Sequence, residues 1–148
     1  MGFFSNLKNA VTGGAATVQI EAGQAQRGQP VPVRVQATAK SDSEINGVYV
    51  LVRAIEQAEV RDTDFDDGEI EREIVRGQRV SFEHRVDLGG PQELKEGESY
   101  TWEGEIPLPP DVGPTFRGHM ICHEWEIQGG LDAFGNDPDS GWVNLEVW

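Results

Sequence analysis

Apolar and polar residues alternate along most of this chain with the period of two that is typical of half-buried β-strands. The clearest alternation covers residues 80–88, where Val80, Phe82 and Val86 alternate with polar neighbours. Similar patterns predict strands at residues 16–20, 31–39, 45–60, 100–108, 119–128 and 143–147. Residues 48–52 are apolar on both faces, which indicates a central strand. The pattern therefore predicts an all-β fold, an antiparallel β-sandwich with turns between short strands.

The first residues follow a different period. Phe3, Phe4, Leu7 and Val11 recur at helical spacing, and two glycines at residues 13 and 14 end the pattern. We therefore expect a short amphipathic helical segment over residues 1–14, followed by one sandwich domain over residues 15–148. Such a segment either covers the core or anchors the chain in a membrane interface. The first role is favoured, because Lys8 is the only basic residue in the segment.

A stretch over residues 100–118 joins an aromatic strand to a proline-rich turn and then to a strand that begins after a glycine. It reads YTWEGEIPLPP, continues with GPTFRG, and is followed by HEWEI at residues 123–127. Together with VQI at residues 18–20 and RGQPV at residues 27–31, this order resembles the arrestin-like superfamily. The start, MGFF with GGA at residues 13–15, is most similar to the sporulation-control (SpoOM) branch. The resemblance implies a single arrestin-like sandwich with an immunoglobulin-like arrangement of two sheets.

The resemblance also implies a function. It implies a non-enzymatic scaffold or adaptor that binds a protein partner, linked to stress or sporulation control, and it brings no catalytic residue and no cofactor. The edge strands of an open sandwich have unpaired backbone groups to which a partner strand can add. We expect one such edge at Val31 and Val33, because Pro32 favours an edge or a strand entry. We expect another at the last strand, with Leu145 and Trp148.

The number of chains in the working unit stays open. Many members of the superfamily have two tandem sandwiches, whereas the 148 residues of this chain suffice for one. A homo-oligomer, in which two chains pair, is therefore one alternative to a monomer.

An acidic segment supports a second function. With Asp62 as the first position, Asp64, Asp66 and Glu73 occupy the third, fifth and twelfth positions of an EF-hand calcium loop. The glycine of that loop is displaced by one residue, to Gly68. The favoured interpretation is a solvated acidic turn between two strands. The alternative is a calcium-modulated sandwich that binds a carbohydrate or a surface through exposed tryptophans, chosen from Trp102, Trp125, Trp142 and Trp148, of which the first two are expected in the core.

His119, Cys122 and His123 are the remaining candidates for chemistry. On a strand the two histidines share a face but stand roughly 13 Å apart, too far to ligate one metal. Cys122 points to the opposite face from His123, and a nucleophile needs its base within hydrogen-bond distance. We therefore predict that the chain is not an enzyme, with Cys122 buried and the two histidines at the surface or at its boundary.

The composition excludes several classes of partner. Lys and Arg number 12 against 26 Asp and Glu, a formal net charge of −14, which repels nucleic acid and anionic lipid. No apolar run approaches the roughly 20 residues of a membrane span, so no stable membrane insertion is expected. A single cysteine excludes an internal disulfide and fits a reducing, cytoplasmic location. The expected partner is therefore a protein.

Overall fold

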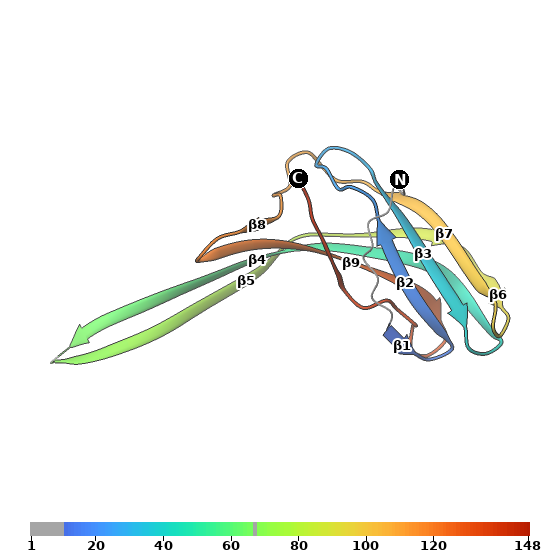
Figure 1. The fold of residues 1–148 in the computed structure, drawn as a ribbon, viewed down its shortest axis with the longest axis horizontal. Helices are drawn as coiled ribbons and strands as arrows, with labels where there is room; N and C mark the ends of the chain where they lie inside the picture. The colour runs from blue at the N-terminus through green and yellow to red at the C-terminus, as the bar shows by residue number, and fades with distance from the viewer. Residues whose placement is uncertain (1–10, 67) are drawn as a thin grey trace.

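The computed structural model describes residues 11–66 and 68–148, which form strands and turns arranged as a two-sheet body with one long projection (Figure 1). The strands are β1 (Val11–Gly13), β2 (Ala16–Ala22), β3 (Val31–Ala39), β4 (Ser43–Asp66), β5 (Glu69–Gly89), β6 (Gln92–Leu94), β7 (Ser99–Ile106), β8 (Phe116–Arg117), β9 (Ile121–Ala133) and β10 (Val143–Leu145). The prediction of an all-β antiparallel sandwich is confirmed.

The strands form two antiparallel sheets. The four-stranded sheet has the order β1-β2-β3-β7, and the six-stranded sheet has the order β10-β9-β4-β5, with β6 paired to β4 and β8 paired to β9. The centre of β4, which is apolar on both faces, lies between β9 and β5, as the sequence predicts. The alternating residues of each strand therefore face either the space between the sheets or the outside.

The core lies between the sheets and contains the apolar positions of the period-two pattern. Val18, Ile20 and Val35 of one sheet and Trp125 and Ile127 of the other are all inaccessible to solvent. Gly129 sets the spacing at the centre, because a Cβ there would lie 3.0 Å from Val35 Cγ2 and 3.4 Å from Ile20 Cβ. The two sheets can therefore approach closely only if this position of β9 has no side chain.

The prediction of an edge at Val31 and Val33 is wrong. Strand β3 lies inside the four-stranded sheet, between β2 and β7, and both valines are fully buried. Pro32 is tolerated at the start of an interior strand because its carbonyl accepts from the Gly23 amide just beyond the end of β2. The Pro32 nitrogen, which has no hydrogen to donate, points to the same side, where β2 has already ended.

The predicted helical segment lies mostly outside the described residues, which begin at Val11. Val11, the last residue of the helical spacing, belongs instead to strand β1 and pairs with Val18 of β2. The prediction of helix is therefore wrong at this position, because backbone pairing along β2 continues to residue 11.

The acidic segment is not a turn. Strands β4 and β5 run through it in continuous register, so that Asp62 is opposite Glu73 and Asp66 is opposite Glu69. The connection lies at Gly68, whose φ of 84° is in the left-handed region that favours glycine. This hairpin is the projection that leaves the body in Figure 1.

Tyr49 provides a test of the packing at the end of the body. Its side chain is buried, and its hydroxyl donates to Asp137 Oδ2 at 3.2 Å. Burial, followed by the charge of Asp137, raises the pKa of Tyr49 to about 12, from an ordinary value of about 10. A folded-state pKa above the unfolded value gives stability that is complete below the unfolded pKa and lost as the pH rises through the folded one.

We therefore expect the melting temperature of the protein to fall as the pH rises from about 10 to about 12. The Tyr49→Phe variant has no ionisable hydroxyl and should lose less stability over the same interval. Thermal melts followed by circular dichroism measure both. Parallel losses in the two proteins would show that Tyr49 is not the titrating group.

Candidate functional site

The projecting hairpin, which we call the arm, consists of residues 59–66 of β4 and residues 69–76 of β5. Within the body β4 pairs with both β5 and β9, but its pairing with β9 ends at Ala58 opposite Ile121. One further bond, from the Glu59 amide to the Met120 carbonyl at 2.7 Å, closes the base. Beyond it the described strands pair only with each other, so the arm is a two-stranded ribbon.

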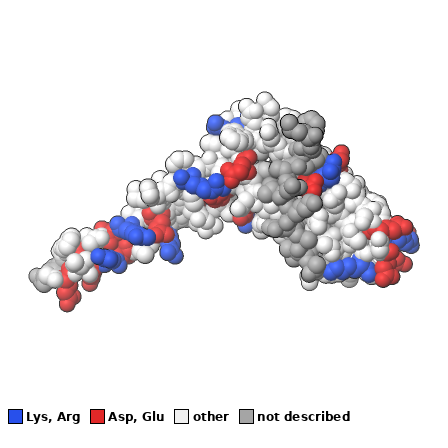
Figure 2. Space-filling view, in the orientation of Figure 1, with Lys and Arg blue, Asp and Glu red and all other residues white. Residues whose placement is uncertain are grey.

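The two faces of the arm differ in chemistry, because alternate residues of each strand point to opposite faces. One face, the Arg–apolar face, contains Arg61, Thr63, Phe65, Ile70, Arg72 and Ile74. At its base Arg76 Nε lies 3.2 Å from Glu59 Oε2, which confirms that residues 59 and 76 share this face. Charges of both signs alternate along the arm in Figure 2.

The opposite face, the acidic face, contains cross-strand pairs of carboxylates. Asp62 stands opposite Glu73 and Asp64 opposite Glu71, with Val60 opposite Val75 nearer the body. Like charges directly opposite each other destabilise a hairpin. These like-charge pairs therefore lower the stability of the arm, and an isolated two-stranded hairpin is only marginally stable in water.

Most of the exposed large apolar side chains of the described residues gather on the arm or where it joins the body. On the arm side they are Val60, Phe65, Ile70, Ile74, Val75 and Val80, and at the junction Phe116, Met120 and Ile121. Phe65, near the tip, is 79% exposed. Among the residues that the structure describes, only Phe134 and Trp148 present large exposed apolar side chains elsewhere. Such a concentration is typical of a surface that contacts a partner.

A hollow of about 490 Å³ lies at the base of the Arg–apolar face. Strands β4 and β5 provide Gln57, Glu59, Arg76 and Gln78, and the segment before and at the start of β9 provides residues 118–122. Cys122 Sγ lies 3.8 Å from Gln57 Oε1 in this lining. The hollow therefore continues the Arg–apolar face onto the body, with walls that are polar and apolar in similar measure.

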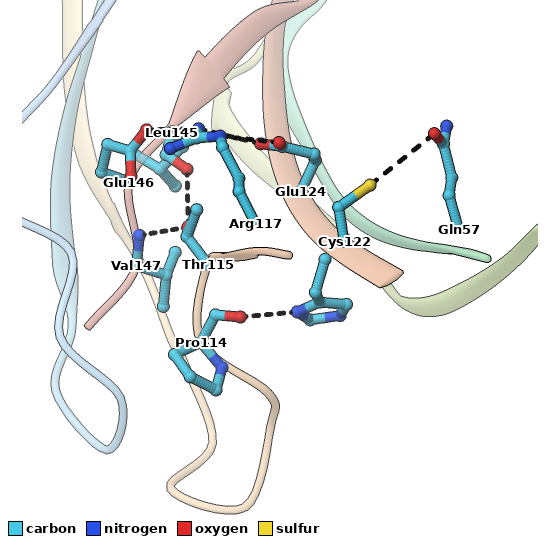
Figure 3. A network of polar contacts seen from close by, with 10 residues as sticks. Gln57, Pro114, Thr115, Arg117, Cys122, Glu124, Leu145, Glu146 and Val147 are labelled. Carbon is cyan, nitrogen blue, oxygen red and sulfur yellow. Dashed lines mark hydrogen bonds and ion pairs between the residues drawn. The ribbon is translucent and has the colours of Figure 1, made fainter. Parts of the chain in front are cut away.

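Arg117 of β8 holds the last residues of the chain against β9 (Figure 3). Its guanidinium donates from Nε and Nη2 to the two carboxylate oxygens of Glu124, at 2.7 and 2.9 Å, and also contacts Glu146. The hydrogen bonds that Arg117 donates to these two carboxylates, the one to Glu146 first, raise the pKa of Arg117 above its usual value. This cluster is exposed, and it ties β8, β9 and the chain end together beside the arm.

The last strand, β10, is an edge strand of the six-stranded sheet, as predicted. Its Leu145 side chain is buried, however, and the Leu145 carbonyl accepts from Thr115 Oγ1. Thr115 Oγ1 in turn accepts from the Val147 amide (Figure 3). Trp148 is 73% exposed, while its amide donates to the Ala25 carbonyl. The binding role predicted for Leu145 and Trp148 stays a prediction, on an edge that is short and partly covered.

The burial of Cys122 and His123 in the structure is the reverse of the prediction. His123 is buried against Trp125, and Cys122 is only half-buried. The prediction of a buried Cys122 beside a surface or boundary His123 is therefore wrong. The signal was present in the sequence, because Trp125 and Ile127 place the odd-numbered residues of this strand toward the core.

His123 contacts a serine that the sequence analysis did not single out. Ser81 Oγ lies 2.6 Å from His123 Nε2, and His123 Nδ1 lies 2.8 Å from the Pro114 carbonyl. Because that carbonyl can only accept, Nδ1 carries a hydrogen, and the Ser81 hydroxyl also donates to the Ala54 carbonyl at 3.3 Å. Ser81 is the extra residue of a β-bulge, since Ala54 pairs with Phe82 and Ile55 with Val80. The contact holds this bulge, and neither residue lines the hollow.

The proposed calcium residues do not form a loop. Asp62, Asp64 and Asp66 follow one another along β4, and the residue opposite Glu73 is Asp62 alone. Among the described residues no three histidine, cysteine or carboxylate side chains are grouped so that they could hold a metal ion. The EF-hand interpretation is therefore wrong, because backbone pairing with β5 keeps the segment extended.

The tryptophans are spread over different environments. Trp125 is fully buried and Trp102 packs partly buried against the core, as expected. Trp142 lies under the Arg53 guanidinium, 3.9 Å from the ring centre. Only Trp148 is exposed to a large extent among the four. A carbohydrate platform built from several tryptophans therefore has no support in this arrangement.

Comparison with known proteins gives a fold but no family. No family model matches the chain, and no curated protein sequence matches it. Among solved structures, the crystal structure of Spo0M, a sporulation control protein from Bacillus subtilis, aligns with a TM-score of 0.62 over 90% of this chain at 20% identity. The chain has the arrestin-like fold of Spo0M. It spans about half the length of that protein, 49%.

The likeness to Spo0M confirms the resemblance inferred from the sequence at the level of the fold.

In the described part of the chain no helix is long and apolar enough to cross a bilayer. What the sequence did not predict is the arm, although Asp67-Gly68 is the dipeptide that favours a two-residue hairpin turn.

Proposed function

We propose that this domain is a non-enzymatic scaffold or adaptor that binds a protein partner, in sporulation or stress control. The observation that carries the proposal is the concentration of exposed apolar side chains on the arm and at its base. The fold shared with Spo0M supports the link to sporulation control, since that protein is described as a sporulation control protein.

The Arg–apolar face defines the chemistry of the partner. On it Ile74 lies opposite Arg61, and Phe65 lies opposite Ile70 nearer the tip, beyond Arg72. A partner segment in which carboxylates alternate with apolar residues would match both features. As in the sequence-based prediction, loops contribute to binding, here residues 118–120 beside the hollow. The arm takes the place of the β3 edge as the main contact surface.

The variant Phe65→Asp tests this proposal. It should reduce recovery of the specific partner from lysate of the source organism at least about tenfold, as the loss of an aromatic anchor at a contact does. Phe134→Asp is the matched control, because Phe134 is a second highly exposed phenylalanine but lies on the body. Recovered proteins are quantified by mass spectrometry at low and high salt.

A partner recovered equally with wild type and Phe65→Asp would overturn the assignment to the arm. A partner retained by Phe134→Asp, lost with Phe65→Asp and weakened at high salt would support both the apolar and the arginine contacts. Circular dichroism spectra of both variants show whether the body remains folded.

A further inference from the structure

Strand β5 ends the six-stranded sheet, and its outer edge has no strand paired to it among the described residues. Edge strands in natural proteins are usually protected by charged side chains, above all lysine, by proline or by a bulge, and the charges of β5 protect it only against a strand that does not complement them. Between Gly68 and the bulge at Ser81, β5 contains no lysine and no proline and pairs with β4 without a register shift. This straight segment, residues 69–80, is therefore a template for another strand.

We propose that the strand that pairs with it is β5 of a second copy of this chain, so that the two arms form one four-stranded antiparallel sheet. A four-stranded sheet removes the weakness of a lone two-stranded ribbon. The same surface patch then serves both copies, as in a closed two-fold dimer. This inference concerns the edge of the arm, whereas the partner proposed above binds its Arg–apolar face; the two surfaces share Ile70 and Ile74.

The charges of β5 select one register. Antiparallel strands related by a two-fold axis pair about a single residue, which faces its own copy. Near the middle of the segment an axis at Glu73 or Arg76 would place that charge against itself, and an axis at Ile74 would place Arg72 against Arg76. Like charges directly opposite each other are destabilising. An axis at Val75 avoids every such pair and, unlike an axis at Gly77, which also avoids them, places Glu71 opposite Arg79.

With the axis at Val75, the pairing runs from Ile70 to Val80 and matches each exposed apolar residue of this segment with an apolar surface. Val75 faces its own copy, Ile70 faces Val80 of the other chain, and Ile74 lies against the aliphatic stem of Arg76. These four apolar side chains are 48–58% exposed in the single chain. The pairing would cover exposed apolar area that β4 leaves in contact with water.

The same register creates two symmetry-related ion pairs, each between Glu71 of one chain and Arg79 of the other. In the single chain Glu71 stands opposite Asp64, and Arg79 lies 3.2 Å from Glu56 with its side chain 72% exposed. A second copy would therefore relieve the like-charge pair at Glu71. The bulge at Ser81 ends the straight segment one residue beyond Val80.

A disulfide at the axis tests the register. In a Cys122→Ser background, Val75→Cys should give a cross-linked dimer under mild oxidation, because directly opposite residues of antiparallel strands have Cα atoms about 4.5–5.5 Å apart, within disulfide range. Val60→Cys is the matched control. Val60 is the residue opposite Val75 on β4, with similar exposure, 50% against 53%, but one strand farther from the axis.

Charge reversal gives a second test that does not depend on oxidation. Glu71→Arg and Arg79→Glu should each raise the dimer dissociation constant at least about tenfold, since each reversal acts twice by symmetry. A mixture of the two variants should restore association as a heterodimer, because every Arg then faces a Glu. Glu93→Arg and Lys95→Glu, on exposed positions at the far end of the body, are controls of equal charge change.

Sedimentation equilibrium over a wide range of protein concentration measures these constants. A monomer at all concentrations, equal cross-linking at residues 60 and 75, or a dimer that ignores both charge reversals would each overturn the inference. If partner recovery depends on Phe65 while the chain stays monomeric, the proposed function stands and the inference fails. If a dimer forms at Val75 and Phe65→Asp has no effect on recovery, the reverse holds.

Discussion

Replacement of Trp125 by alanine is expected to lower the free energy of unfolding by about 3–5 kcal/mol, the range for a large buried aromatic residue. Trp125 is fully buried on β9, in the middle of the six-stranded sheet. Its ring packs against Phe82 of β5, with 5.3 Å between ring centres, and meets the His123 ring edge-on. Its Nε1–H donates to the Gly113 carbonyl at 2.9 Å.

The size of the effect follows from these three contacts together. The alanine variant would leave a cavity between the sheets and remove the donor that satisfies the Gly113 carbonyl. It would also remove the support of His123, which holds the bulge at Ser81. The bulge lies on β5 within the body, a few residues beyond Arg76 at the base of the arm, so the loss should be transmitted to that base.

Urea denaturation followed by tryptophan fluorescence and circular dichroism measures the loss. Trp148→Ala is the control, since Trp148 is 73% exposed and should change stability by less than about 0.5 kcal/mol. A loss below about 1 kcal/mol for Trp125→Ala would contradict the described core.

The body could be predicted from the sequence because burial determines its pattern. Val18, Ile20, Val33 and Val35 alternate with polar residues, and this period requires strands that are half-buried. The order of the strands in the sheets could not be predicted in the same way. Pro32 indicated an edge, but an interior strand also accepts proline where its neighbouring strand has already ended.

The arm was missed for a different physical reason. Its residues also follow period two, since Ile70, Arg72 and Ile74 alternate with Glu71 and Glu73, but neither face is buried by the body. Carboxylates at every second position were therefore attributed to a metal-binding or solvated turn. The hairpin signal at residues 67–68 gives the place of the turn, whereas the length of the projection depends on where β9 stops pairing with β4.

Shortening the arm is expected to abolish binding while the body remains folded. In this variant Asn-Gly replaces residues 60–75, so that Glu59, Asn, Gly and Arg76 form a four-residue loop closed by Ala58 and Gly77, which are directly opposite each other. The described side chains of the removed segment are exposed, at residues 60–65 and 68–75, so the core loses no buried contact. The melting temperature should therefore stay within a few degrees of the wild-type value.

The binding effects of the shortened arm should be large by comparison. Both the Arg–apolar face beyond Arg76 and the two-fold axis at Val75 are removed, so neither partner recovery nor dimer formation should be detectable. The hollow keeps its lining, because Gln57, Glu59, Arg76, Gln78 and residues 118–122 remain. A partner still recovered by this variant would therefore bind to the hollow, the loops or the β10 edge, and the scaffold function would then belong to the body rather than to the arm.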